Sequence, residues 1–187
     1  LAYADDVDLL GRNVRTLKEN FIQLEEASTR AGLTINMAKT KYMVMTRKST
    51  ITSNALLEIQ GYQFEKVTTF KYLGSLISEK NEISLEIGER INAGNRCYFS
   101  VQDLMKTRLL SMRQSRMVIR PVVTYAVETW VLTKRDVELL NMWERKILFQ
   151  EGGEWRIRTN LELYELYEDP PITAEVRAAQ LRWLGHL

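Results

Sequence analysis

The sequence has few of the residues that build disulfides and zinc sites. Among its 187 residues there is one cysteine, Cys97, and one histidine, His186. A single cysteine excludes a disulfide framework within the chain and favours the cytosol or the nucleus. Because no cysteine or second histidine lies near His186 in the sequence, we do not expect it to bind zinc within this chain.

Long hydrophobic runs are also missing. No apolar stretch approaches the length of a membrane span, so we expect no contact with a membrane. The first residues include acidic side chains and no basic segment, which is not the pattern of a signal peptide. The sequence begins at Leu1 rather than methionine and ends within an amphipathic pattern, "RWLGHL". We therefore expect a piece of a longer intracellular protein, in the nucleus or the cytoplasm.

The basic residues are unevenly distributed along the chain. With 45% hydrophobic and 27% charged residues, the composition is that of a globular protein, and the net charge is only +2. Residues 88–120, however, contain seven basic and two acidic residues, a net charge of +5. Such a segment is either a phosphate-facing surface or a solvated helix face, and charge alone does not separate the two.

The first third of the chain predicts a hairpin followed by a helix. The stretch "LAYADDVDLL" at residues 1–10 is typical of two short strands with Asp5 and Asp6 as the turn between them. Apolar residues at helical spacing follow. Asn13 is a suitable N-cap for this helix, and Gly32 is a suitable C-terminal stop.

Extended structure is expected next. Residues 33–47 alternate apolar and polar side chains, with a turn predicted at residues 36–39. Residues 56–78 are rich in residues that favour strands and are interrupted by Gly61 and Gly74. Two or three short strands fit this segment.

The apolar period becomes helical near residue 82. A helix of about six turns is predicted to begin at Ile83. Capping boxes at Ser111 and Thr133 predict the starts of two more helices, of which the first is expected to kink or break at Pro121. The stretch 173–185 predicts a last helix. The chain is thus expected to have an α+β half followed by an all-α half.

The adjacent carboxylates of Asp5 and Asp6 need an explanation. Between apolar strands they would be costly to bury without a counter-charge. We therefore expect divalent cations, with the phosphate oxygens of a substrate, to neutralise them. A solvent-exposed Asp-Asp turn is the simpler alternative, and the pair alone favours it.

Three motifs in a fixed order favour a metal-binding role for the Asp pair over a simple exposed turn. "YADD" is followed by the helix, then by "GLTINMAKTKYM", then by "FKYLGSLIS". In this order the chain resembles the reverse transcriptases of non-LTR (LINE-type) retrotransposons, which carry a Tyr-x-Asp-Asp hairpin, a helix, a "GL-x-IN-x-x-KT" segment and a "YLG" hairpin. The stretches "VVTYAVETW", "MWERKIL" and "RWLGH" resemble the helical tail of these proteins, so the resemblance covers nearly the whole chain. A group II intron maturase, or another polymerase of the same palm type, would fit "YADD" alone equally well.

The resemblance implies an α+β fold with a partial polymerase palm, made of antiparallel β-hairpins and one packed helix, and then an all-α thumb and helical tail. Residues 1–82 would be the C-terminal part of the palm and residues 83–150 the helical thumb. Residues 151–187 would be a truncated helical extension. The fingers and the upstream palm strand, which carries a further catalytic aspartate, would belong to the same polyprotein outside this chain.

The resemblance also implies catalytic roles. Asp5, Asp6 and Lys39 would be catalytic, and the two aspartates would bind Mg²⁺ or Mn²⁺, with Asp5 the more direct ligand. Tyr3 would lie beside the primer end and the incoming nucleotide. Lys39 would lie near the leaving pyrophosphate, and Lys41 is the alternative for that position.

Two groups of residues would contact nucleic acid. The primer-grip hairpin would contain Phe70, Lys71, Tyr72, Leu73 and Gly74. The basic segment would form the thumb surface that faces the template–primer duplex, through Arg90, Arg96, Lys106, Arg108, Arg113, Arg116 and Arg120. Other large side chains of these helices are predicted to be core rather than base-stacking residues: Tyr98, Phe99, Met105, Trp130 and Trp143.

The function implied is RNA-directed DNA synthesis from an RNA template, a DNA primer and dNTPs by two-metal phosphoryl transfer. Two carboxylates from one turn cannot complete two octahedral metal shells, so we expect the chain alone to bind Mg²⁺ weakly and not to polymerise. One alternative is a non-catalytic nucleic-acid-binding module in which only the basic helices matter. Another is an inert relic of a mobile element.

Overall fold

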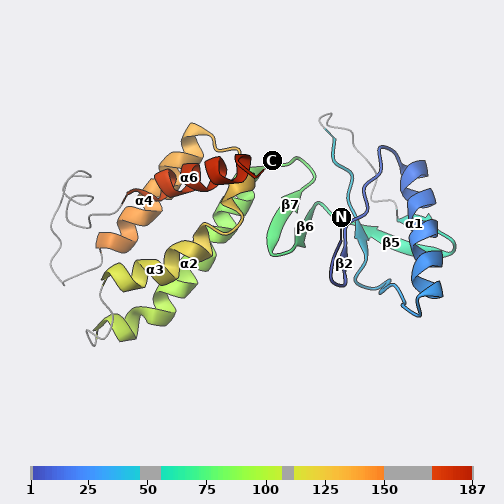
Figure 1. Ribbon diagram of the computed structural model, residues 1–187, viewed down its shortest axis with the longest axis horizontal. Coiled ribbons are helices and arrows are strands. Elements are labelled where there is room, and N and C mark those ends of the chain that lie inside the picture. The colour runs from blue at the N-terminus through green and yellow to red at the C-terminus, as the bar shows by residue number, and fades with distance from the viewer. Residues whose placement is uncertain (1, 47–55, 107–111, 150–169, 187) are drawn as a thin grey trace. The chain divides into compact units, whose positions relative to one another are not determined.

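The computed structural model describes residues 2–46, 56–106, 112–149 and 170–186 (Figure 1). Contacts within the chain divide it into two compact units, Leu1–Glu82 (unit 1) and Ile83–Leu187 (unit 2). The division falls where the sequence period becomes helical. In the described residues of unit 1 one helix accompanies several short strands, and the described elements of unit 2 are all helical.

Unit 1 begins with the expected hairpin. Strand β1, Ala2–Tyr3, pairs antiparallel with β2, Asp6–Val7, and Tyr3 lies opposite Asp6. The turn is therefore Ala4–Asp5, and the prediction of an Asp5–Asp6 turn was wrong by one residue. Ala4 has a φ of 52°, the positive value that tight two-residue turns need, and Asp6 joins the strand ladder instead.

Helix α1, Val14–Arg30, has both predicted ends. Asn13 Oδ1 accepts a hydrogen bond from Thr16 N at 2.8 Å, which confirms the N-cap. Gly32 follows the last turn with a φ of 74° and donates its N–H to Thr29 O. The next N–H, of Leu33, bonds to Ser28 O at 2.8 Å, and the two bonds together form a Schellman C-cap.

A three-stranded sheet packs against α1. Strand β5, Tyr62–Lys66, lies in its centre, parallel to β3, Lys41–Tyr42, and antiparallel to β4, Leu57–Ile59. The buried core contains Phe21, Leu57, Ile59 and Phe64. The rings of Phe21 and Phe64 meet edge to face, with centroids 5.1 Å apart, so this aromatic contact joins the helix to the sheet.

Residues 56–78 form four strands rather than the two or three expected. The dipeptide Gln60–Gly61 joins β4 to β5, and Leu73–Gly74 joins β6, Thr69–Tyr72, to β7, Ser75–Ser78. Both dipeptides have positive φ at each residue, 49° and 83° in the first and 48° and 80° in the second. Because this is what a two-residue type I′ turn requires, each dipeptide closes a hairpin of its own.

Unit 2 contains four described α-helices and one short 3₁₀ helix: α2 Ile83–Lys106, α3 Met112–Val123, η1 Val127–Thr129, α4 Lys134–Phe149 and α6 Ile172–Leu184. The predicted starts of α2 and α4 are confirmed, and α3 begins directly after Ser111, which lies outside the described residues. Pro121 does not break α3, which continues for two more residues. Proline removes one N–H donor from the helix, but only two helical residues follow it, so the loss affects only the C-terminal end of α3.

Close helix packing forms the core of unit 2. A Cβ atom on Gly94 of α2 would lie 2.5 Å from Val123 Cγ2 and 2.7 Å from Trp143 Cζ2, so only glycine fits there. Trp143 Nε1 donates to Asn95 Oδ1 at 2.8 Å. The buried cluster consists of Ile87, Tyr98, Ile119, Val123, Val127, Trp130, Leu140, Trp143, Ile172 and Val176. Among the described helices, none combines the length and the hydropathy that a bilayer span requires.

Asp136 joins the first turns of α4 and α2. Its Oδ2 accepts from Thr133 N at 2.9 Å and Thr133 Oγ1 at 2.7 Å, and its Oδ1 accepts from Ser84 Oγ at 2.8 Å. The side chain is only 2% exposed. Burial raises the pKa of Asp136, but the hydrogen bonds from Thr133 and Ser84 outweigh it and leave this pKa below its ordinary value. The predicted capping box at Thr133 is thus confirmed.

Candidate functional site

The "YADD" hairpin is open to solvent. Tyr3 is 68% exposed, and the side chains of Asp5 and Asp6 are exposed as well. The expectation that an apolar setting makes these carboxylates depend on a counter-charge was therefore wrong for this chain. Its strands are two residues long and none of their four residues is buried, so water can solvate both carboxylates.

The two aspartates supply only part of a metal site. Carboxylate oxygens are ligands that Mg²⁺ prefers, and Asp5 and Asp6 are adjacent on the turn and the following strand. Among the described residues, no group of three or more His, Cys, Asp or Glu side chains is placed to hold a metal ion. An ion held by Asp5 and Asp6 would take its remaining ligands from water or from outside the described residues.

The segment with the two candidate lysines forms the predicted turn. Asn36 O accepts from Lys39 N at 3.2 Å and from Thr40 N at 3.0 Å, which confirms a turn at residues 36–39. The Lys39 side chain is exposed. Lys41 Nζ instead lies 2.6 Å from Glu65 Oε2 on β5, in an ion pair across the parallel strands. This geometry favours Lys39 over Lys41 as the lysine that could meet an external phosphate.

The "YLG" motif forms the tip of the hairpin β6–β7. Phe70 is 40% and Leu73 39% exposed, and Lys71 and Gly74 are also exposed. Tyr72 is half-buried opposite Ser75. The three motifs thus occupy three separate elements of unit 1: the hairpin β1–β2, the turn before β3 and the hairpin β6–β7.

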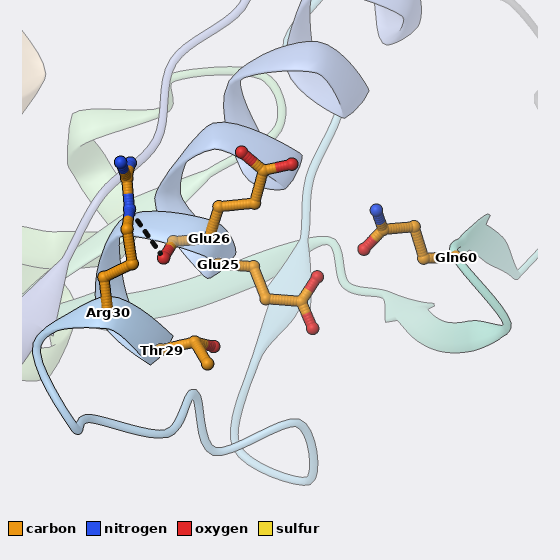
Figure 2. A pocket seen from close by; sticks show the side chains of 5 residues that line it. All are labelled: Glu25, Glu26, Thr29, Arg30 and Gln60. Carbon is orange, nitrogen blue, oxygen red and sulfur yellow. Dashed lines mark hydrogen bonds between the residues drawn. The ribbon is translucent and has the colours of Figure 1, made fainter.

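An open pocket lies elsewhere in unit 1, between α1 and the turn of β4–β5 (Figure 2). Its volume is about 520 Å³, and its lining consists of Glu25, Glu26, Thr29, Arg30 and Gln60. Arg30 Nε donates to the backbone oxygen of Glu26 at 3.4 Å, as the dashed line in Figure 2 shows. None of the residues predicted to act in catalysis or nucleic-acid binding lines this pocket.

Arg120 is part of a polar network inside unit 2. Its guanidinium pairs with Glu144 of α4, with Nε at 2.9 Å from Oε1, and it also donates to Pro170 O at 2.7 Å. Glu175 of α6 lies 3.4 Å from Nη1. The other oxygen of Glu144 accepts from Ile172 N at 3.0 Å. Arg120 and Glu144 therefore hold three helices together, which sequence reasoning missed because the partners are far apart in the chain.

Arg90 is likewise engaged within unit 2. Its Nε lies 2.7 Å from Glu86 Oε1, and its guanidinium carbon lies 4.5 Å from the centre of the Tyr125 ring. The side chain of Arg90 is 14% exposed, and that of Glu86 is 4% exposed. Both arginines at the ends of the basic segment, Arg90 and Arg120, therefore stabilise the helical unit.

The remaining basic residues lie between those two. Arg96 is exposed on α2. Lys106 is the last residue of α2, and Arg113 and Arg116 belong to α3, but their side chains lie outside the described part of the structure, as does all of Arg108.

The prediction for the aromatic residues was right for three and wrong for one. Tyr98, Trp130 and Trp143 are buried, with exposures of 4%, 3% and 6%. Phe99 is 62% exposed. Consecutive helical residues point about 100° apart, so Tyr98 occupies the core position and directs Phe99 away from it. The side chain of Met105 lies outside the described residues.

No protein-family model matches this chain, and no solved structure matches it. The chain is 24% identical over 200 residues to a Caenorhabditis elegans protein described as "Putative uncharacterized transposon-derived protein F52C9.6". The match covers 100% of this chain and 70% of the nematode protein. The chain is thus similar along its whole length to a transposon-derived protein, which supports a relationship to transposable elements and names no enzymatic activity.

Proposed function

We propose that this chain is part of an RNA-directed DNA polymerase of the non-LTR retrotransposon type. Residues 1–82 would be the C-terminal part of its palm, residues 83–150 its thumb and residues 151–187 a helical extension. The observation that carries the proposal is that "YADD" forms a hairpin with a two-residue turn and that a capped helix follows it. The order of the later motifs and the similarity to a transposon-derived protein add support.

In this reaction the primer 3′-hydroxyl attacks the α-phosphorus of a dNTP and pyrophosphate leaves. Asp5 and Asp6 would hold Mg²⁺ or Mn²⁺ together with oxygen ligands from the upstream palm of the same polyprotein. The bound ions would stabilise the charge on the attacking and leaving oxygens. The exposed ammonium of Lys39 would stabilise the pyrophosphate, and Tyr3 would pack beside the incoming nucleotide.

The hairpin β6–β7 and the basic helices would hold the template–primer. Gly74 has no Cβ, so the sugar–phosphate backbone could approach the hairpin tip closely. In unit 2 the contacts to phosphates would come from Arg96, Lys106, Arg108, Arg113 and Arg116. Arg90 and Arg120 are left out of this set because acidic partners inside the unit hold their guanidinium groups.

Paramagnetic Mn²⁺ tests the metal site directly. In NMR spectra of the whole chain, Mn²⁺ should broaden the amide signals of residues 3–7 before others, because two adjacent carboxylates are an oxygen-rich site. The double variant D5N/D6N should remove this broadening, while D8N, a nearby carboxylate outside the proposed site, should leave it. If D5N/D6N and the wild type broaden alike, the aspartates are not metal ligands.

Primer extension tests the reaction. The chain alone should give no template-dependent DNA synthesis with Mg²⁺ or Mn²⁺, because its metal site is incomplete. A chimera that adds the fingers and upstream palm of a non-LTR reverse transcriptase should extend a DNA primer on RNA. D5N should lower that activity by at least about 100-fold, the order of loss found for one transition-state contact. Synthesis by the chain alone, or full activity of the D5N chimera, would refute the proposal.

A further inference from the structure

Helix α2 presents an aromatic ring and an arginine together to solvent. Phe99 is 62% exposed, and Arg96, three residues earlier, is exposed as well. Side chains three residues apart lie on the same helix face, so the ring and the guanidinium are neighbours. The Phe99 ring also packs edge to face on the buried Tyr98, with centroids 5.5 Å apart at 71°. This contact joins the exposed ring to a residue of the buried core.

Arg96 differs from the two other described arginines of the basic segment. Arg90 and Arg120 are held by acidic partners inside unit 2. The guanidinium of Arg96 makes no ion pair or hydrogen bond with any residue that the structure describes. Within the described part of the chain its charge is therefore unpaired, three residues from a ring that is 62% exposed.

The surrounding sequence indicates the charge of that ligand. Residues 96–116 contain five basic residues and one acidic residue, a net charge of +4 within a chain of net charge +2. A polyanion is the complementary partner. An apolar protein partner would use the ring but leave Arg96 unpaired, and an acidic peptide would use the arginine but not the ring. Single-stranded nucleic acid offers both phosphates and exposed base faces.

We propose that Phe99 and Arg96 form a stacking site for an unpaired base of single-stranded RNA or DNA, in which the arginine contacts the adjacent phosphate. The proposed polymerase function places only backbone contacts on unit 2, so this site goes beyond it. The site also needs no catalysis. If the chain does not bind Mn²⁺ at Asp5 and Asp6, the polymerase proposal is refuted, but the proposed stacking site is not affected by that result.

Fluorescence anisotropy of the whole chain with labelled dT12 and U12, and with a blunt duplex of the same length, tests the site. F99A should weaken binding to the single strands by about 5- to 100-fold, because one base–aromatic stack is lost. Binding to the blunt duplex should change less than about twofold, since its bases are already stacked. R96A should weaken single-strand binding. It should also reduce the slope of the logarithm of the binding constant against the logarithm of the salt concentration by about one.

Three variants distinguish base stacking from a general apolar contact and from a change of fold. F99W keeps an aromatic face and should retain binding, whereas F99L keeps apolar area without that face and should lose it. L85A is the matched control, because Leu85 lies on the same helix with 43% exposure and outside residues 96–116. Far-UV circular dichroism should show an unchanged fold for all of them. The proposal would be overturned if F99L bound single strands as tightly as the wild type. It would also be overturned if F99A weakened binding to single strands and to the duplex equally, or if L85A weakened single-strand binding as much as F99A.

Discussion

At the scale of single residues, polar contacts inside unit 2 are as specific as its apolar core. Glu144 is 3% exposed. One of its oxygens pairs with Arg120, and the other accepts a hydrogen bond from the backbone N–H of Ile172 in the first turn of α6. Asp136 is 2% exposed, and it accepts hydrogen bonds from Thr133 at the start of α4 and from Ser84 in the first turn of α2. Because a buried carboxylate is tolerated only where hydrogen bonds and charges satisfy it, these two residues fix how the helices meet.

Asp136 makes the stability of unit 2 depend on acid pH. Its pKa is lowered in the folded state, so its contribution is present above the unfolded-state pKa of about 3.9 and is lost as the pH falls below it. We expect D136N to lower the free energy of unfolding at pH 7 by about 1–2 kcal/mol, as for a lost N-cap. The difference between D136N and the wild type should shrink below about pH 4.

Tryptophan fluorescence in urea measures this effect in unit 2 alone, because all four tryptophans of the chain lie after residue 82. E138Q, an exposed carboxylate on the same helix, is the control and should follow the wild type within about 0.5 kcal/mol. If the free energy of unfolding differs between D136N and the wild type by the same amount down to pH 2, Asp136 is not the source of the acid sensitivity.

At the scale of elements, α2 contains two glycines in opposite environments. A Cβ at Gly94 would collide with Val123 and Trp143, whereas a Cβ at Gly88 would meet nothing within 4 Å. G94A should therefore destabilise unit 2 by about 1–3 kcal/mol through overpacking. G88A should stabilise it by up to about 1 kcal/mol, since alanine is the better helix former. Urea unfolding followed by tryptophan fluorescence would show the two shifts, and equal shifts would mean that α2 does not pack as described.

Elements with local signals were predicted well from the sequence. The Asn13 cap, the Thr133 capping box and the turn at residues 36–39 depend on neighbours within a few positions. The turn of the first hairpin was misplaced, because an adjacent Asp pair tolerates more than one register. The strands of residues 56–78 were undercounted, because strand propensity alone treats Gly61 and Gly74 as interruptions rather than as turn residues, although the "YLG" motif predicted a hairpin at residues 70–74.

Long-range partners set the limits of prediction for the candidate site. Arg120 looks like any basic residue of the segment, and only Glu144, 24 positions later, makes it structural. Phe99, by contrast, points about 100° away from Tyr98 around the helix, so the helical spacing of the apolar residues already favours Tyr98 for the core. The solvent exposure of Asp5 and Asp6 depends on which elements cover their hairpin.

At the scale of the whole molecule, nucleic-acid binding must come from the distribution of charge rather than its total. A net charge of +2 attracts a polyanion weakly, but five basic residues in positions 96–116 form a local excess. The double variant R113A/R116A should therefore weaken binding to an RNA–DNA hybrid and reduce its salt slope by about two ions. K134A/R135A removes the same charge from exposed positions of α4 outside this segment, so it should have a much smaller effect. Equal losses for the two double variants, measured by anisotropy across a salt series, would mean that only net charge matters and that no part of unit 2 is a dedicated nucleic-acid surface.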